Sequence, residues 1–257
     1  MIKIFIALLL LTLSPFLKAE PIQCKRTDEG VIQLLKNPGN RLSFKNKGGL
    51  GNGGVCWWHS RFERAASYLA AFDPSLAKPT KSELYDLLRD ITLMKPVTIP
   101  GYSNLFEVSS ENVPLFQKIL NHWQARDAFI NQAWTRGLKG SVHMDADKLH
   151  AHMNQIFDQF QKKRKPYFLM LQMPSVVAHA YLLLDMIKTE TGYEMYVVDS
   201  NFPLKVVTQI YNIGDETLIY GNKSMIDMIG DPFIPYLGFA RDYKKMEREL
   251  SDFCHKI

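Results

Sequence analysis

The sequence predicts an α+β fold, in which a helical N-terminal half packs against a C-terminal antiparallel β-sheet. Two observations lead to this prediction. Before residue 166, apolar side chains recur three or four positions apart over long stretches, which is typical of helices that bury one face. After it, short β-branched and aromatic runs are separated by brief turns, which is typical of consecutive antiparallel strands. We therefore predict one domain at 20–257, with a helical half at 20–165 and a sheet half at 166–257.

The helical half is expected to contain four helices, and a fifth closes the chain. Apolar spacing places the four at 56–72, 83–93, 110–134 and 145–162, and the last one begins near Arg241. His122 lies on the apolar face of the third helix, so we expect it to be packed in the core. The segment 98–107 carries a Pro-Gly pair and is predicted to be irregular, as one wall of a groove.

The sheet half is expected to contain five strands in succession, at 167–173, 178–187, 193–199, 204–211 and 217–220. His179 stands at the start of the second strand and Asp199 at the end of the third. Adjacent antiparallel strands can place the start of one beside the end of the next. We therefore expect this imidazole and this carboxylate to meet at one edge of the sheet.

The first residues predict export. Lys3 precedes an apolar run over 4–13, and a cleavage point after Ala19 completes the pattern of a signal peptide at 1–19. The run is too short to span a membrane comfortably, so we expect a secreted or periplasmic protein without stable membrane association. The formal charge of +5 includes Lys3 and Lys18. Without them, 29 basic and 26 acidic side chains leave a charge near +3, which is too small to indicate nucleic-acid binding.

The cysteines are Cys24, Cys56 and Cys254. An exported chain favours disulfides, and an odd count leaves one thiol over. Cys24 and Cys254 lie near the two ends of the predicted domain, and chain ends often lie close together. We expect these two to pair, so that Cys56 keeps its thiol. No metal site or cofactor is predicted.

Cys56 follows a glycine-rich stretch and begins a predicted helix. The apolar stripe of this helix consists of Trp58, Phe62, Ala65, Ala66, Leu69 and Phe72, and Cys56 lies off it. The first turn of a helix offers N–H groups and the positive end of the helix dipole, which favour a thiolate. Gly53 and Gly54 remove side chains where an extended substrate would approach. A structural cysteine in a glycine turn remains the alternative.

A cysteine nucleophile needs a base within hydrogen-bond reach, and the base needs a third group that orients it. Cys56, His179 and Asp199 supply these three residue types, and we predict that they form a catalytic triad. Two alternatives stay open. His59 is a rival base three residues after the cysteine, and Asn201 is a rival to the aspartate.

Three short motifs resemble those of papain-like cysteine peptidases. Gly-Gly-Val-Cys-Trp-Trp at 53–58 resembles the start of the nucleophile helix, His179-Ala180 the histidine strand, and Val-Asp-Ser-Asn-Phe-Pro at 198–203 the strand end with the orienting residue. The histidine lies 123 residues and the aspartate 143 residues after the cysteine. Papain-type enzymes have them about 130–150 residues downstream.

The resemblance implies a papain-like fold with the nucleophile helix packed on the sheet, and hydrolysis of peptide bonds through a thioester acyl-enzyme. The implied partner is a peptide or protein substrate. One position departs from the family. Leu50 stands where papain-type enzymes have a glutamine that binds the oxyanion, so Asn52 is the candidate for this role, together with the Cys56 N–H. The departure favours a divergent, bacterial-type branch.

Two other functions remain compatible with these motifs. The same triad would serve acyl transfer by a transglutaminase or an amidase. The chain could also be a papain-like binding module that has lost catalytic activity.

Overall fold

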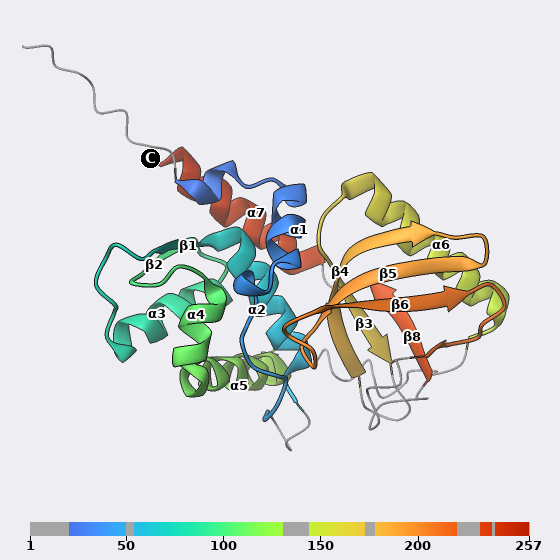
Figure 1. Cartoon of the computed structure of the whole chain (residues 1–257), viewed down its shortest axis with the longest axis horizontal. Helices are drawn as coiled ribbons and strands as arrows, with labels where there is room; N and C mark the ends of the chain where they lie inside the picture. Colours follow the sequence, from blue (N-terminus) through green and yellow to red (C-terminus); the bar gives the residue numbers. More distant parts are fainter. Residues whose placement is uncertain are drawn as a thin grey trace, which may run out of the picture.

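The structure is a computed structural model, and it describes residues 21–49, 54–130, 144–172, 178–219, 232–237 and 240–256. The expected signal peptide, Asn52, Gly53 and the predicted helix end at 134 lie outside these residues. The described part is α+β, as predicted, with most helices gathered on one side and an antiparallel sheet on the other (Figure 1).

The chain order gives the elements of both parts. The helical elements are η1 (Ile22–Lys25), α1 (Asp28–Lys36), η2 (Pro38–Asn40), α2 (Cys56–Leu69), α3 (Lys81–Thr92), α4 (Leu105–Glu111), α5 (Val113–Ile130), α6 (Ala146–Lys163) and α7 (Ala240–His255). The strands are β1 (Ala70–Asp73), β2 (Val97–Pro100), β3 (Tyr167–Gln172), β4 (Ala178–Lys188), β5 (Gly192–Asp199), β6 (Val206–Asn212), β7 (Leu218–Ile219) and β8 (Pro232–Leu237).

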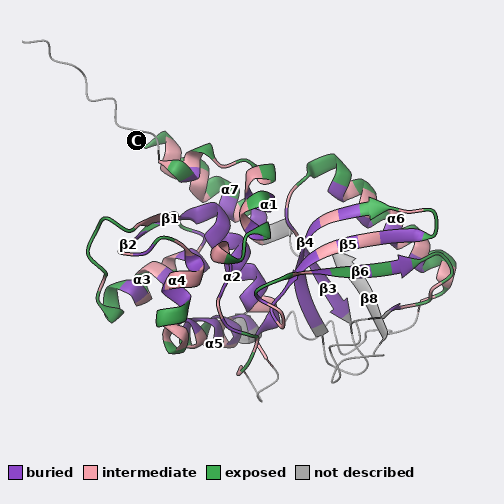
Figure 2. Ribbon diagram, in the orientation of Figure 1, coloured by how far each residue is buried: buried purple, intermediate pink, exposed green. Residues whose placement is uncertain are grey.

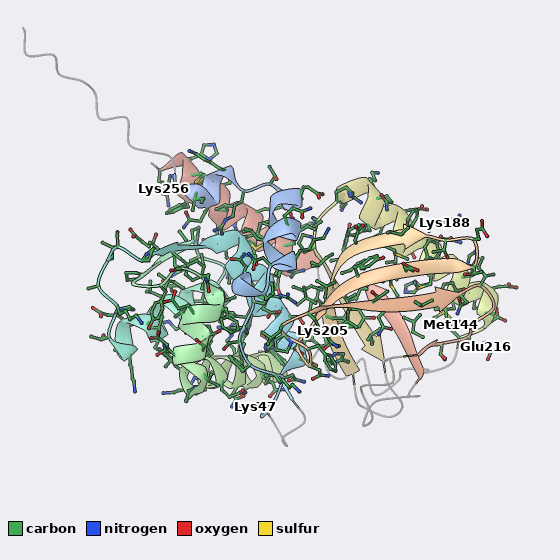
Figure 3. All side chains as sticks on the ribbon, viewed as in Figure 1. Lys47, Met144, Lys188, Lys205, Glu216 and Lys256 are labelled. Atoms are coloured by element: carbon green, nitrogen blue, oxygen red, sulfur yellow. A yellow bond between two sulfur atoms is a disulfide. The ribbon has the colours of Figure 1, made fainter. Side chains whose placement is uncertain are left out.

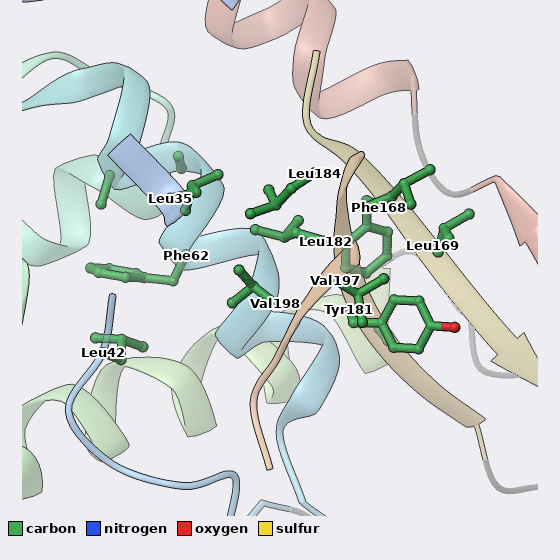
Figure 4. Close-up of a cluster of buried hydrophobic side chains, with 14 of the residues drawn as sticks. Leu35, Leu42, Phe62, Phe168, Leu169, Tyr181, Leu182, Leu184, Val197 and Val198 are labelled. Carbon is green, nitrogen blue, oxygen red and sulfur yellow. The ribbon is translucent and has the colours of Figure 1, made fainter. Parts of the chain in front are cut away.

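The main sheet has the strand order β6-β5-β4-β3-β8-β7, and all its neighbours run antiparallel. The side chains of β3 and of the first half of β4 alternate between two buried faces, whereas β6 exposes alternate residues. In Figure 4, Leu182, Leu184 and Val198 extend towards the helix that carries Phe62, whereas Leu169 and Tyr181 point the other way. The first group packs on α2. On the other side, α6 covers the sheet, since its Gln161 donates to the carbonyl of Met186.

The helix α2 lies between the helical part and the sheet, and it is buried on nearly every face (Figure 2). This differs from the prediction of a helix with one buried stripe. The charged face is buried because partners from distant elements neutralise it. Arg61 forms ion pairs with Asp127 of α5 and Asp242 of α7, and its guanidinium lies 4.3 Å from the ring of Trp123. Buried charges require such partners.

Several sequence predictions need correction. The helix expected at 56–72 ends at Leu69, and the chain continues as β1, which pairs in parallel with β2. The segment 98–107, expected to be irregular, therefore begins inside a strand and ends inside α4. The helix expected from residue 110 is preceded by α4 and begins anew at Val113. His122 is exposed, not packed in the core, and its Nδ1 lies 3.1 Å from the hydroxyl of Tyr85.

The predicted disulfide between Cys24 and Cys254 is present, with 5.8 Å between the two Cα atoms. It joins η1 to the end of α7, which lie side by side in Figure 1. The bridge closes a loop over a sequence separation of 230 residues. None of the helices that the structure describes combines the length and apolar character needed to cross a bilayer.

Candidate active site

The start of α2 positions Cys56, the cysteine that is not in a disulfide. The two residues before it, Gly54 and Val55, are held by backbone hydrogen bonds. The Gly54 N–H donates to the carbonyl of Gly48 at 2.8 Å, and the Gly54 carbonyl accepts from Gln124 Nε2 at 3.1 Å. The Val55 N–H donates to Asn46 Oδ1 at 2.6 Å. Gly54 has a φ of +89°, a conformation in which a side chain would be strained. These contacts fix the backbone on which the thiol is mounted.

The strand register positions His179 and Asp199. Tyr181 of β4 pairs with Asp199 of β5, so the two residues share one face of the sheet. His179 precedes Tyr181 by two positions and lies on the same face, diagonally opposite the aspartate. Its Nε2 lies 2.9 Å from Asp199 Oδ1. The same oxygen accepts the Asn201 N–H at 2.8 Å, which holds the carboxylate in place.

The imidazole also contacts the thiol. A side-chain hydrogen bond joins His179 to Cys56, so the three predicted residues meet although they come from both halves of the chain. Burial lowers the pKa of His179, but this effect is outweighed. The charges of Asp199 and Cys56, and hydrogen bonds to both, raise the pKa to about 10. The ring is therefore an imidazolium at neutral pH. Because Nε2 is engaged with Asp199, Nδ1 is the nitrogen that faces the sulfur.

The site is largely shielded from water. Cys56 is 9% exposed, His179 3% and Asp199 0%. A low local dielectric strengthens the attraction between a thiolate and an imidazolium. The arrangement can therefore hold a nucleophilic sulfur beside a protonated acid, which is what acyl transfer through a thioester requires.

The two rival residues lie in other settings. His59 is fully buried on α2, and its Nε2 lies 3.1 Å from the carbonyl oxygen of Phe44. Its Nδ1 lies 3.7 Å from Glu63 Oε2 on the next turn. Asn201 contributes its backbone N–H to Asp199, while Asp199 itself binds the ring of His179.

The oxyanion site is only partly described, because Asn52 lies outside the described residues. The N–H groups of Gly54 and Val55 already donate within the loop. The Cys56 N–H lies in the first turn of α2, where the positive end of the helix dipole favours an oxyanion. Sequence reasoning missed Asn46 and Gln124, the side chains that hold this loop. No local signal marks them, since both contacts join residues that are apart in the sequence.

Within the described ranges, no group of three or more His, Cys, Asp or Glu side chains could hold a metal ion. Comparison with protein-family models, with curated proteins and with solved structures finds no match for the chain.

Proposed function

We propose that this protein is an exported cysteine hydrolase that cleaves peptide bonds in peptide or protein substrates. The observation that carries the proposal is the meeting of Cys56, His179 and Asp199 across the two halves of the chain. The cysteine is at a helix start, the imidazole is hydrogen-bonded to it, and the carboxylate lies 2.9 Å from the far side of the ring. Each group has the partner that a thiol nucleophile needs.

The reaction follows from the charges of these groups. His179 holds the proton of Cys56, and the thiolate attacks the carbonyl carbon of the peptide bond. The Cys56 N–H and Asn52 donate hydrogen bonds to the oxyanion that forms. His179 then gives its proton to the leaving amine, which leaves a thioester on Cys56. In the second half, neutral His179 takes a proton from water as the water attacks the thioester, and the acid product departs. Asp199 keeps the ring oriented and stabilises its charged form.

Export belongs to the same proposal. It is supported by the signal-peptide pattern at 1–19 and by the disulfide, because disulfides form and persist in oxidising compartments outside the cytosol. We therefore propose a periplasmic or secreted location for the enzyme.

Alkylation with iodoacetamide tests the nucleophile without a known substrate. Cys24 and Cys254 form the disulfide, so one thiol per chain is left to react. At mildly acidic pH we expect stoichiometric and fast labelling of Cys56 in the wild type, because the imidazolium of His179 beside the sulfur favours the thiolate. His179→Ala is the matched control, and we expect it to react at least tenfold more slowly at this pH. Wild-type protein that reacts no faster than this variant would contradict the proposal.

The reaction itself is tested with casein in the presence of a fluorescent amine. We expect new casein fragments with the wild type and none with Cys56→Ser. Incorporation of the amine without fragments would identify acyl transfer to amines as the reaction. Neither product, together with an inert Cys56, would indicate a binding module.

A further inference from the structure

Asn46 joins the loop before α2 to the loop after β5. Its backbone N–H donates to the carbonyl of Ser200 at 2.8 Å, and Ser200 directly follows Asp199. Its side-chain Oδ1 accepts the Val55 N–H at 2.6 Å, and Val55 directly precedes Cys56. In Figure 3 the labels Lys47 and Lys205 show where these two loops lie.

We propose that Asn46 is a positioning residue that sets the distance between the nucleophile and the histidine–aspartate pair. The inference rests on the proposed function, because it concerns the same site. The cysteine and the aspartate belong to different halves of the chain, and each lies one residue from a group that Asn46 binds. A shift of this residue would therefore move Cys56 relative to Asp199 and the ring that it holds.

The local packing leaves this side chain little freedom. A Cβ built on Gly54 would lie 2.8 Å from Asn46 Nδ2, so the amide is in close contact with the backbone of the loop. Val55 is the N-cap residue of α2, and its own side chain makes no capping hydrogen bond. The N–H of this N-cap residue instead donates to the side-chain oxygen of Asn46, which lies ten residues before Cys56. Because the acceptor belongs to another segment of the chain, this hydrogen bond fixes the start of α2 relative to Asn46.

Positioning matters because displacements of about 1 Å cost enzymes about 10²-fold in rate. Asn46→Ala removes the acceptor, and Asn46→Asp keeps an acceptor oxygen but adds a negative charge at the N–H of Val55, the residue before Cys56. Asn104→Ala is the matched control, because Asn104 Oδ1 caps α4 through the Glu107 N–H at 2.8 Å and lies in the helical part. All three variants are compared with the wild type by thermal unfolding, by peptide cleavage and by the rate of Cys56 alkylation between pH 4 and 10.

We expect Asn46→Ala to lower kcat and the alkylation rate at pH 6 by about ten- to hundredfold. Asn46→Asp should reach the wild-type alkylation rate at high pH. The acid limb of its pH–alkylation profile should move to higher pH, because a nearby carboxylate disfavours the thiolate. Asn104→Ala should lose a similar amount of thermal stability and keep the wild-type pH profile. If Asn46→Ala does not fold, the position of the acid limb in the alkylation profile of Asn46→Asp tests the proposal.

The proposal is overturned if Asn46→Ala matches Asn104→Ala in every pH profile, or if Asn46→Asp keeps the wild-type acid limb. Failure of the proposed function gives a different result. In that case the wild type cleaves no peptide, while the alkylation profiles still report whether Asn46 controls the contact between Cys56 and His179.

Discussion

Two buried histidine–carboxylate pairs lie in the part of the chain that the structure describes, and they differ in what the far side of the ring contacts. His59 and Glu63 lie four residues apart on α2, with 3.7 Å between Nδ1 and Oε2, and both side chains are fully buried. His179 and Asp199 lie on neighbouring strands, with 2.9 Å between Nε2 and Oδ1. The second nitrogen of His59 faces a backbone carbonyl, whereas that of His179 faces a thiol.

The comparison teaches that burial and a carboxylate do not by themselves make a histidine reactive. The carbonyl of Phe44 only accepts, so His59 must carry a proton on Nε2 to donate to it. Glu63 has further partners, since its Oε1 accepts the Leu42 N–H at 2.9 Å. Burial lowers the pKa of Arg41, and the negative charge of Glu63 partly offsets this by raising it. The His59 pair thus contacts backbone groups of the helical half, whereas the His179 pair contacts Cys56, with which it can exchange a proton.

The largest effect is expected when each histidine is removed in turn. His179→Ala should lower kcat/KM for peptide cleavage by about 10³-fold or more, because the base and the imidazolium are lost together. His59→Gln should leave kcat/KM of the folded protein within about threefold, and cost about 1–3 kcal/mol of stability through a disturbed buried polar group. Urea unfolding and initial rates measure both. If the folded His59→Gln variant lost as much activity as His179→Ala, the proposed difference between the two pairs would be wrong.

The sequence predicted the His179 pair better than it predicted the helix that carries His59. Strand alternation and turn residues located β3 to β6 to within a few residues, and register then follows from which positions are apolar. The three residues of the proposed triad could be predicted because they stand at element ends, and adjacent antiparallel strands can bring such ends together. The disulfide followed from the cysteine count.

The missed features depend on contacts between distant residues. Arg61 and Glu63 have the composition of a solvated helix face, and the partners that allow Arg61 to be buried, Asp127 and Asp242, lie on two other helices. The parallel pair β1–β2 is four residues long on each strand, which gives too short a pattern to identify. Asn46 belongs to a loop whose composition predicts a turn. That composition does not indicate that Asn46 accepts a hydrogen bond from Val55.

Removing the charge of each carboxylate gives the second prediction. Asp199→Asn keeps an oxygen for the ring, so we expect a smaller loss of kcat/KM, about 10–10²-fold. Because the charge of Asp199 raises the pKa of His179, the alkaline limb of the kcat/KM profile should move to lower pH. Glu63→Gln should leave this limb in place, since Glu63 belongs to the other pair. An alkaline limb that stays fixed in Asp199→Asn would show that another group titrates there.

The dependence of stability on pH gives the third prediction. The folded state raises the pKa of His179 from 6.5 to about 10. The stability that comes from the protonated ring is therefore complete below pH 6.5 and is lost as the pH rises through about 10. The difference in free energy of unfolding between the wild type and His179→Gln should thus shrink across this window. In an Asp199→Asn background the decline should begin and end at lower pH. A difference that is constant from pH 6 to 10 would contradict the ion pair.

The smallest effect concerns Tyr181, which stands opposite Asp199 and 6.2 Å from the ring of His179. Its hydroxyl is buried and has no hydrogen-bond partner among the described residues, and burial followed by the charge of Asp199 raises its pKa. Tyr181→Phe should therefore leave kcat/KM within about twofold and leave stability equal or up to about 1 kcal/mol higher, since an unsatisfied polar group is removed. Tyr193→Phe is the matched control, because its side chain is also buried in the sheet, its hydroxyl donates to Asn154, and loss of this bond should cost about 1 kcal/mol. The expectation is wrong if Tyr181→Phe costs more stability than Tyr193→Phe, or lowers kcat/KM tenfold. In that case the phenol of Tyr181 orients Asp199, and this carboxylate needs a support that Glu63 does not have.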